Sequence, residues 1–323
     1  MAGGDGRLTL RRRLPTLPRS RWPAADVSQQ KNPMSAYPTT PESLLPLVLA
    51  AMSGTPDARL RELMASLTRH LHQFVLENRV TEAEFEGAVG FVVGIGQATS
   101  ATKNEVILAS DLFGVSTLVA LLNNPGAAGQ DADIALLGPF WRARAPLLPA
   151  GADIASPGTA GEPLLVSGRV LEPDGKPLAG ASVDVWQASP LGLYENQDPD
   201  QPDMNLRGRF ITDAEGAYHF RSVRPAGYPV PTDGPCGALL RAQRRQALRP
   251  AHLHFMVSQP GYRVLVTQVY PEGCEHLDDD PVFGVTAALV GRFESAAGAL
   301  PGRLQRDFTL QPGDTVFPQP PIP

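Results

Sequence analysis

The sequence predicts an α+β protein in which an all-helical N-terminal part precedes an antiparallel β-sandwich. Between residues 43 and 124, apolar residues recur every three or four positions, which is the period of an amphipathic helix. After Pro125 the pattern changes to short runs of β-type residues separated by glycine and proline. No helical pattern alternates with these runs, so an antiparallel sandwich or barrel is favoured over a parallel sheet with crossover helices.

The helical part divides into several segments. The strongest pattern runs from Leu60 to Phe74, where leucines recur on one face of the expected helix. Further helices are expected near residues 82–99 and 105–122, and the sequence Asn-Asn-Pro-Gly closes the second of them. We therefore expect three or four helices before the sandwich.

The expected strands follow one another at short intervals. They are the segments 164–170, 182–187, 209–212, 217–223, 252–258, 263–269 and 307–310. The sequence before Ser43 contains arginines and prolines but no periodicity, which predicts disorder. We therefore expect three parts: a disordered leader over residues 1–42, a helical domain over 43–125 and the sandwich domain over 126–323.

The composition argues against several classes of protein. A formal net charge of -5 at pH 7 does not provide the basic surface of a nucleic-acid binder. Two cysteines in 323 residues are too few for a disulfide framework and fit a reducing cytoplasm. No apolar run approaches the roughly 20 residues that are needed to cross a bilayer. We therefore expect a cytoplasmic protein with no nucleic-acid partner and no membrane span.

The segment Arg249-Pro-Ala-His252-Leu-His254-Phe is the sharpest local signal. Residues two apart in a strand point to the same face, so His252 and His254 can present two imidazoles to one metal ion. The alternating Leu253 and Phe255 then supply apolar side chains to the opposite face. By itself the pattern also fits one core histidine and one surface histidine.

A metal ion held by two histidines needs further ligands. A carboxylate from the run Asp278-Asp279-Asp280 would complete a two-histidine, one-carboxylate iron(II) site, but the surrounding glycine, glutamate and proline are typical of a solvated loop. Phenolate oxygen is a hard, strongly donating ligand that suits iron(III). Tyr194 and Tyr228 both lie between turn residues. These residues alone leave both options open.

Several motifs together resemble those of the intradiol ring-cleavage dioxygenases, in the branch of hydroxyquinol, catechol and chlorocatechol 1,2-dioxygenases. In chain order they are Leu-Gly-Pro-Phe (137–140), Asp-Val-Trp-Gln (184–187), Gly-Leu-Tyr (192–194), Asn-Leu-Arg-Gly-Arg-Phe (205–210), Tyr-Pro-Val-Pro-x-Asp-Gly-Pro (228–235), Arg-Pro-Ala-His-Leu-His-Phe (249–255) and Val-Thr-Gln-Val (266–269). The likeness runs from about residue 43 to residue 310. A chance match of the whole ordered series is improbable.

The resemblance implies a non-haem iron(III) site in the sandwich domain. Tyr194, Tyr228, His252 and His254 match the metal ligands of the family, with Tyr228 and His254 as the axial pair and a hydroxide as the fifth ligand. Tyr228 is implied to leave the iron when the substrate binds, and so to take part in catalysis.

The resemblance also implies roles for residues and domains around the metal. Arg249 would stabilise negative charge that builds up on the ring, and Gln268 would hydrogen-bond near the iron. In this branch the helical domain forms the dimer interface and commonly encloses a phospholipid. We therefore expect a homodimer through the N-terminal helices and a lipid within them.

The implied reaction inserts both atoms of O2 into a catechol-type ring. The expected substrate is hydroxyquinol (1,2,4-trihydroxybenzene), giving 3-hydroxy-cis,cis-muconate or maleylacetate, because several motifs resemble the hydroxyquinol enzymes most. An aspartate in an apolar pocket can accept a hydrogen bond from the third hydroxyl group. The matching positions of the substrate pocket are Leu108, Asp111, Leu136, Pro139, Phe140, Val282 and Phe283. Gln268 after Thr267 instead follows the catechol pattern, because many hydroxyquinol sequences carry histidine there.

Three alternatives remain at this point. A catechol or chlorocatechol 1,2-dioxygenase would give cis,cis-muconates from the same kind of site. An extradiol or hydroxylating enzyme would use iron(II) with two histidines and a carboxylate. A non-catalytic β-sandwich binding protein would use the His-x-His pair for a structural metal and would be colourless.

Overall fold

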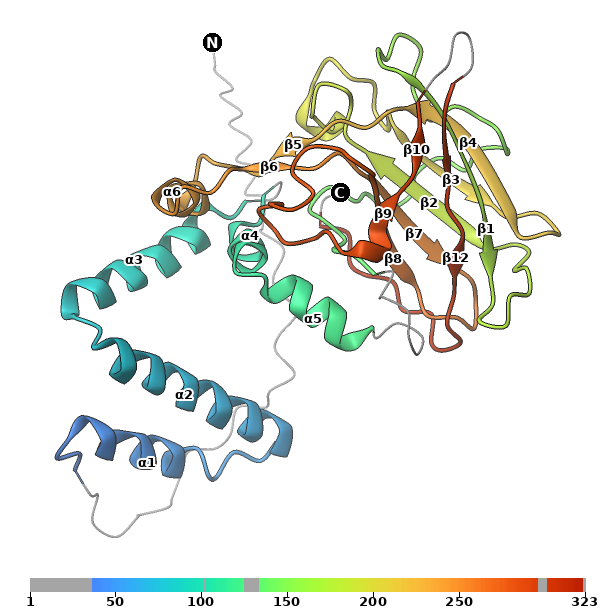
Figure 1. Cartoon of the computed structure of the whole chain (residues 1–323). Coiled ribbons are helices and arrows are strands. Elements are labelled where there is room, and N and C mark those ends of the chain that lie inside the picture. Colours follow the sequence, from blue (N-terminus) through green and yellow to red (C-terminus); the bar gives the residue numbers. More distant parts are fainter. Residues whose placement is uncertain (1–36, 101–102, 125–133, 296–300, 322–323) are drawn as a thin grey trace, which may run out of the picture. The chain divides into compact units, whose positions relative to one another are not determined.

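The computed structural model describes residues 37–100, 103–124, 134–295 and 301–321 (Figure 1). The chain forms two compact units, one that ends at Thr81 and one that begins at Glu82. Most of the expected leader, residues 1–36, lies outside the described residues. Helix begins at Pro41, two residues inside the end of that expected leader.

The first unit contains helices α1 (Pro41–Ala51) and α2 (Ala58–Asn78). The Asp57 side chain accepts a hydrogen bond from the backbone N–H of Leu60, which satisfies a donor that the helix start leaves free. The expected leucine stripe is present on α2, but its side chains are exposed, with Leu67 at 50% and Phe74 at 58%. Within the described residues this apolar face of α2 is thus exposed.

The second unit begins with helices α3 (Glu82–Ala98), α4 (Glu105–Leu112) and α5 (Val115–Asn123). The prediction of one helix over 105–122 was wrong, because Phe113 and Gly114 separate α4 from α5 with a bend of 78°. Gly114 adopts a positive φ of 69°, a conformation that ends a helix and that glycine adopts without strain. Within the described residues, no single helix is long and apolar enough to cross a membrane, and only the bent α4–α5 pair passes that test jointly.

The sandwich consists of two main sheets (Figure 1). One has the order β3 (Arg207–Ile211), β2 (Ser182–Gln187), β7 (Leu253–Ser258), β8 (Leu265–Pro271) and β9 (Val290–Gly291). The other contains β1 (Pro163–Leu171), β4 (Ala217–Val223), β10 (Phe293–Glu294), β11 (Gly302–Gln305) and β12 (Phe308–Thr309). The expected fold class is confirmed, and the sheets also include parallel pairs of β1 with β11 and β12 that the sequence pattern did not reveal.

The core between the two sheets comes from the alternation of each strand. Val183 and Val185 of β2, Phe255 and Val257 of β7, and Phe220 of β4 belong to one buried cluster, each with an exposed fraction of 0%. The intervening residues of β2 and β7 therefore point to the opposite face of their sheet. That opposite face carries the site described below.

The segment between β4 and β7 contains elements that sequence patterning missed. It forms β5 (Tyr228–Pro229), helix α6 (Pro235–Ala242) and β6 (Leu248–Arg249). The short strands pair antiparallel, so that Tyr228 lies directly opposite Arg249. Helix α6 packs with α3 and α4 in a second apolar cluster that includes Leu112 and Leu240. The pairing of β5 with β6 thus brings together Tyr228 and Arg249, which the sequence analysis named separately.

The remaining short elements lie in connecting loops. They are the 3₁₀ turns η1 (Glu195–Gln197) and η2 (Ala287–Leu289). The first directly follows Tyr194, and so fixes the backbone next to that residue.

Candidate metal centre

Four side chains named by the sequence meet at one end of the β2–β7–β8 face. His254 lies on β7 and His252 directly before it, while Tyr194 precedes η1 and Tyr228 begins β5. All four are buried, with exposed fractions between 0% and 4%. The His-x-His spacing thus places both imidazoles together as expected, and two distant loops add the phenols.

The four donor atoms lie within contact distance of one another. The Tyr194 hydroxyl is 2.9 Å from His254 Nε2, and the Tyr228 hydroxyl is 3.5 Å from His252 Nε2. The two histidine Nε2 atoms are 3.0 Å apart. Ligands bound at about 2.1 Å and at right angles to one another are separated by about 3 Å, so this spacing fits donors to a single ion.

The rings around these donors are held in place by neighbours. His252 Nδ1 lies 2.7 Å from the Pro250 carbonyl oxygen, and N–H donation to it leaves Nε2 as the lone-pair nitrogen facing the centre. Trp186 of β2 stacks on the His254 ring, with centroids 4.7 Å apart and planes 10° from parallel. Both imidazole orientations are therefore fixed by groups outside the donor set.

The pKa values of the buried donors bear on their ability to bind a metal cation. Burial, and then the nearby Arg249, lower the pKa of His252 well below its usual range; burial, His252 and Arg249 do the same for His254. Both imidazoles are thus neutral and able to donate a lone pair. Burial, and then the neighbouring Tyr228, raise the pKa of Tyr194 well above its usual range. A buried phenolate here needs a cation beside it.

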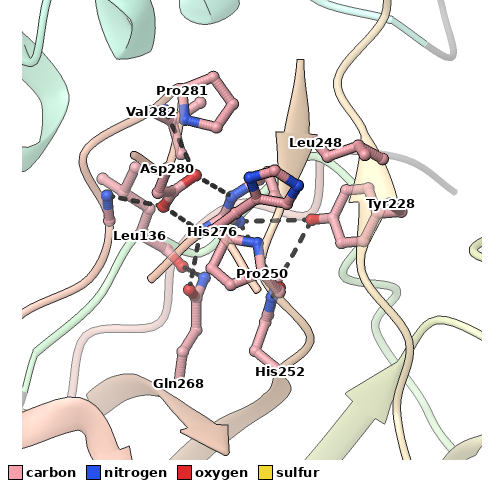
Figure 2. Close-up of polar contacts among 12 residues, drawn as sticks. Leu136, Tyr228, Leu248, Pro250, His252, Gln268, His276, Asp280, Pro281 and Val282 are labelled. Carbon is pink, nitrogen blue, oxygen red and sulfur yellow. Dashed lines mark hydrogen bonds and ion pairs between the residues drawn. The ribbon is translucent and has the colours of Figure 1, made fainter. Parts of the chain in front are cut away.

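The Arg249 guanidinium lies within hydrogen-bonding distance of this donor set. Its Nη1 lies 3.3 Å from the Tyr228 hydroxyl and 3.4 Å from His252 Nε2. Its Nη2 donates to Gln268 Oε1 at 3.2 Å and to the Tyr270 hydroxyl at 2.7 Å. Tyr228, His252 and Gln268, which are labelled in Figure 2, therefore all contact the Arg249 side chain. The guanidinium, which is 4% exposed, therefore joins the donor set to strand β8.

Gln268 links the same strand to both sides of the site. It is the cross-strand partner of His254, and its Nε2 lies 3.2 Å from His254 Nδ1. The same nitrogen donates to the Leu136 carbonyl oxygen at 2.7 Å. Gln268 therefore contacts the candidate ligand His254 from the neighbouring strand.

The expectation of a solvated loop at residues 278–280 was wrong for Asp280. Asp278 and Asp279 are exposed, but Asp280 is 4% exposed and receives Arg249 Nε and Nη2 on its two oxygens, each at 3.2 Å. Within the described residues, no group of three histidine, cysteine or carboxylate side chains gathers for a metal. The structure therefore offers the tyrosines, and no such carboxylate, as companions of the two histidines.

A cluster of ion pairs that the sequence analysis did not predict lies next to Tyr194. Glu195 Oε1 is 2.8 Å from Arg142 Nη1, and Glu195 Oε2 is 2.8 Å from Arg207 Nε. The Arg207 guanidinium also lies 5.9 Å from the centroid of the Tyr194 ring. The only sequence signal was that Arg207 falls inside one of the ordered motifs. Nothing in that motif predicts that its side chain pairs with Glu195.

Comparison with known proteins decides the family. Residues 136–312 match the family model described as Dioxygenase, and residues 57–131 match that described as Catechol dioxygenase N terminus. The chain belongs to the intradiol dioxygenases. It is therefore an oxidoreductase of a family that uses non-haem iron.

Individual relatives of this dioxygenase are similar over most of their length. A hydroxyquinol 1,2-dioxygenase from Rhizobium sp. is 45% identical over 78% of this chain and 85% of its own. A catechol 1,2-dioxygenase from Candida albicans is 41% identical over 76% of this chain and 82% of its own. The crystal structure of a hydroxyquinol 1,2-dioxygenase from Pseudomonas putida is 38% identical, with a TM-score of 0.79 over 84% of this chain and 99% of that one.

The expected pocket residues of the dioxygenase come together only in part. The Phe140 ring lies 4.5 Å from the Tyr194 ring and 6.1 Å from the Tyr228 ring. Half-buried Pro139 directly precedes it. Leu136 contacts Gln268 through its carbonyl oxygen. This linker segment therefore borders the donor set.

The other expected pocket residues lie on α4 and on the loop after Asp280. Leu108 and Val282 belong to one buried cluster. Burial raises the pKa of half-buried Asp111 to about 6. A hydrogen bond with Ser116 and the charge of Arg249 lower this pKa, and the charge of Asp280 raises it. Phe283 is 51% exposed. The Arg245 guanidinium carbon lies over the Phe283 ring, 4.9 Å from the ring centroid. The Phe283 side chain thus contacts Arg245 rather than the four donors.

Proposed function

We propose that this chain is a hydroxyquinol 1,2-dioxygenase. It opens 1,2,4-trihydroxybenzene between the two adjacent hydroxyl-bearing carbons and adds both atoms of O2, giving 3-hydroxy-cis,cis-muconate or its tautomer maleylacetate. The observation that carries the reaction is the meeting of two phenol oxygens and two imidazole nitrogens beside one buried guanidinium.

The metal ligands would be Tyr194, Tyr228, His252 and His254, which fit ferric iron by donor type and by spacing. Bound iron(III) supplies Lewis acidity that lowers the pKa of the substrate hydroxyl groups, and the redox chemistry that lets the ring react with O2. The protein supplies the binding, the proton transfer and the charge stabilisation around it.

Tyr228 acts as the internal base. As a catechol-type substrate binds, the Tyr228 phenolate oxygen would accept the proton of one of its hydroxyl groups. Arg249 Nη1, at 3.3 Å from that oxygen, is placed to stabilise negative charge on the ring as the proton leaves. Gln268 holds Arg249 Nη2 and so supports the same arrangement.

Asp111 determines the substrate in this proposal. A half-buried carboxylate within the field of Arg249 accepts a hydrogen bond from the third hydroxyl of hydroxyquinol. The remaining walls of the pocket would be Leu108, Leu136, Pro139, Phe140, Val282 and Phe283. The hydroxyquinol enzymes among the relatives support this choice.

Catechol is the second candidate substrate, because Gln268 follows the catechol-type pattern and a similar Candida albicans relative is a catechol 1,2-dioxygenase. The test is a steady-state comparison of hydroxyquinol, catechol and chlorocatechols on the iron-loaded protein. We expect the highest kcat/KM for hydroxyquinol. A higher value for catechol would overturn the substrate and keep the reaction.

The visible spectrum tests the site itself. Tyrosinate bound to iron(III) gives a broad visible absorption band, so protein with full iron content should be coloured. Colourless protein at full occupancy would overturn the ligand proposal and favour a structural metal or an iron(II) enzyme.

The helical unit would serve assembly. We propose that the exposed apolar face of α2, including Leu67 and Phe74, is covered in a homodimer that also encloses a phospholipid. Light scattering gives the mass in solution, and mass spectrometry of an organic extract detects the lipid. A monomer without lipid would contradict this part of the proposal alone.

A further inference from the structure

The guanidinium of Arg249 is divided between two tasks. Its Nη1 faces the donor set, where it contacts Tyr228 and His252. Its Nε and Nη2 face away and make a fork-to-fork pair with the two oxygens of Asp280. A planar guanidinium that is held along one edge leaves its remaining nitrogen in a fixed direction.

Asp280 is itself fixed before it meets the arginine. Its Oδ2 accepts a hydrogen bond from the Gly284 backbone N–H at 2.9 Å, and its Oδ1 lies 3.4 Å from the backbone N–H of Val282 (Figure 2). The Asp280 carboxylate is thus held in place by backbone N–H groups of the loop that follows it. A long, freely rotating arginine is therefore held by a short side chain that cannot move with it.

The loop packs closely against the guanidinium at Gly284. A Cβ atom at Gly284 would lie 2.8 Å from Arg249 Nη2, 3.1 Å from Asp280 Oδ2 and 3.2 Å from the Tyr270 hydroxyl. The Tyr270 hydroxyl accepts from Arg249 Nη2 at 2.7 Å and donates to Gln268 Oε1. Gly284, Asp280 and Tyr270 thus all lie against Arg249 Nη2, on the side away from Nη1.

We propose that Asp280, supported by Tyr270, is a positioning residue that holds Arg249 Nη1 toward the reacting ring. The inference rests on the proposed ring cleavage, because the orientation of Arg249 matters only if negative charge develops on a substrate ring beside its Nη1. Asp280 does not touch the substrate or the metal ligands. It acts through Arg249 and sets the transition-state contact without contributing to metal binding.

The first test is Asp280→Asn, with Asp279→Asn as a matched control. Asp279 is exposed, and within the described residues its side chain pairs with His276, so the same chemical change there should leave kcat, KM and the spectrum unaltered. For Asp280→Asn we expect kcat for hydroxyquinol to fall about 100-fold, the scale of a misplaced catalytic group. We expect KM to change less than about 3-fold, because the lost contact is made in the transition state.

Two readouts separate positioning from a structural role. Iron content and the visible band of the resting protein should stay as in the unaltered enzyme, since the four ligands are untouched. The dissociation constant for hydroxyquinol, measured without oxygen, should also stay within about 3-fold. Loss of iron or of the band would show that Asp280 maintains the metal site, and would overturn the proposal.

A double-variant cycle tests whether the effect runs through Arg249. In an Arg249→Gln background, adding Asp280→Asn should lower kcat by less than about 2-fold, because there is no guanidinium left to direct. A further loss of about 10-fold or more would mean that Asp280 acts independently. The double variant also removes the unpaired buried charge that each single change leaves behind.

Tyr270→Phe decides the question if Asp280→Asn does not fold. It removes one hydroxyl from Arg249 Nη2 and keeps the ring, and we expect kcat to fall by about 3- to 10-fold with unchanged KM and spectrum. An unchanged kcat would overturn the proposal. Unaltered enzyme that shows neither a visible band nor turnover would instead refute the proposed function, whatever the variants do.

Discussion

The two tyrosines of the site stand in different surroundings. The Tyr194 side chain is 0% exposed, packs against Phe140 at 4.5 Å and leads into a turn that Glu195 ties to Arg142 and Arg207. Tyr228 begins a two-residue strand, and its hydroxyl contacts the guanidinium of Arg249. Its distance to the nearest histidine nitrogen is 3.5 Å, against 2.9 Å for Tyr194.

We propose that this difference assigns different roles to two chemically equal candidate ligands. On the Tyr194 side, ion pairs join the ligand loop to the body of the domain, which favours a ligand that stays in place. On the Tyr228 side, the cation of Arg249 can stabilise a phenolate or a substrate oxygen away from the iron. We therefore distinguish a holding half, around Tyr194, and a reacting half, around Tyr228. The predictions below test that division.

The largest effect should come from removing each phenol oxygen. Tyr228→Phe should keep most of its iron but shift the visible band and lower kcat by about 1000-fold, because the internal base is gone. Tyr194→Phe should instead lose iron, measured as metal per chain after dialysis. Equal iron loss in both variants would abolish the distinction between the two halves.

The ion cluster behind Tyr194 should matter for folding rather than for chemistry. Glu195→Gln leaves the buried guanidinium of Arg207 without its charge partner, so unfolding free energy should fall by about 3–5 kcal/mol. Chemical denaturation of the metal-free protein measures this change. Asp174→Asn, which breaks an exposed pair with Lys176, is the control and should leave the midpoint unaltered. A similar midpoint for both variants would contradict the holding role.

A change at Asp111, in the reacting half, should alter kcat/KM for hydroxyquinol and leave kcat/KM for catechol nearly unchanged. Asp111→Asn should lower kcat/KM for hydroxyquinol by about 10- to 100-fold, since the third hydroxyl loses a charged acceptor. The value for catechol, which lacks that hydroxyl, should stay within about 2-fold. Equal losses for both substrates would place Asp111 outside substrate recognition.

The smallest expected effect is on pH-dependent stability. Burial raises the pKa of Asp111 to about 6 from its usual 3.8, so its ionisation destabilises the folded state. This cost is absent below about pH 4 and complete above about pH 6. Asp111→Asn should therefore gain about 1–2 kcal/mol over the unaltered protein as pH rises through this window, after allowance for partial exposure. Denaturation midpoints at pH 4, 5, 6 and 7 give the difference, and a pH-independent difference would contradict the assignment.

Much of this architecture was predictable from local sequence patterns. Alternation in the strand around His252 and His254 predicted both the apolar core face and the paired imidazoles, and the structure shows both. Helical periodicity predicted α2 and α3. The ordered motifs indicated the family, which the comparisons confirm.

Local patterns failed where a contact joins residues far apart in the chain. Asp280 was expected to be solvated because its neighbours are polar, yet it is buried and pairs with Arg249, 31 positions earlier. Glu195 meets Arg142, 53 positions away, and nothing in either neighbourhood predicts the other. The break at Gly114 was missed because glycine fits both a weak helix and a turn.

The sequence by itself determined that a helical part precedes a sandwich of strands, that two histidines lie two residues apart on one face, and the family of the enzyme. Only the tertiary structure decided that a guanidinium is clamped by Asp280 and that the two tyrosines differ in their surroundings. The physical reason is that periodicity records which face of one element is buried. The partner of a buried charge is instead chosen by how separate elements pack, because a charge removed from water must be paired wherever the fold brings a counter-charge within reach.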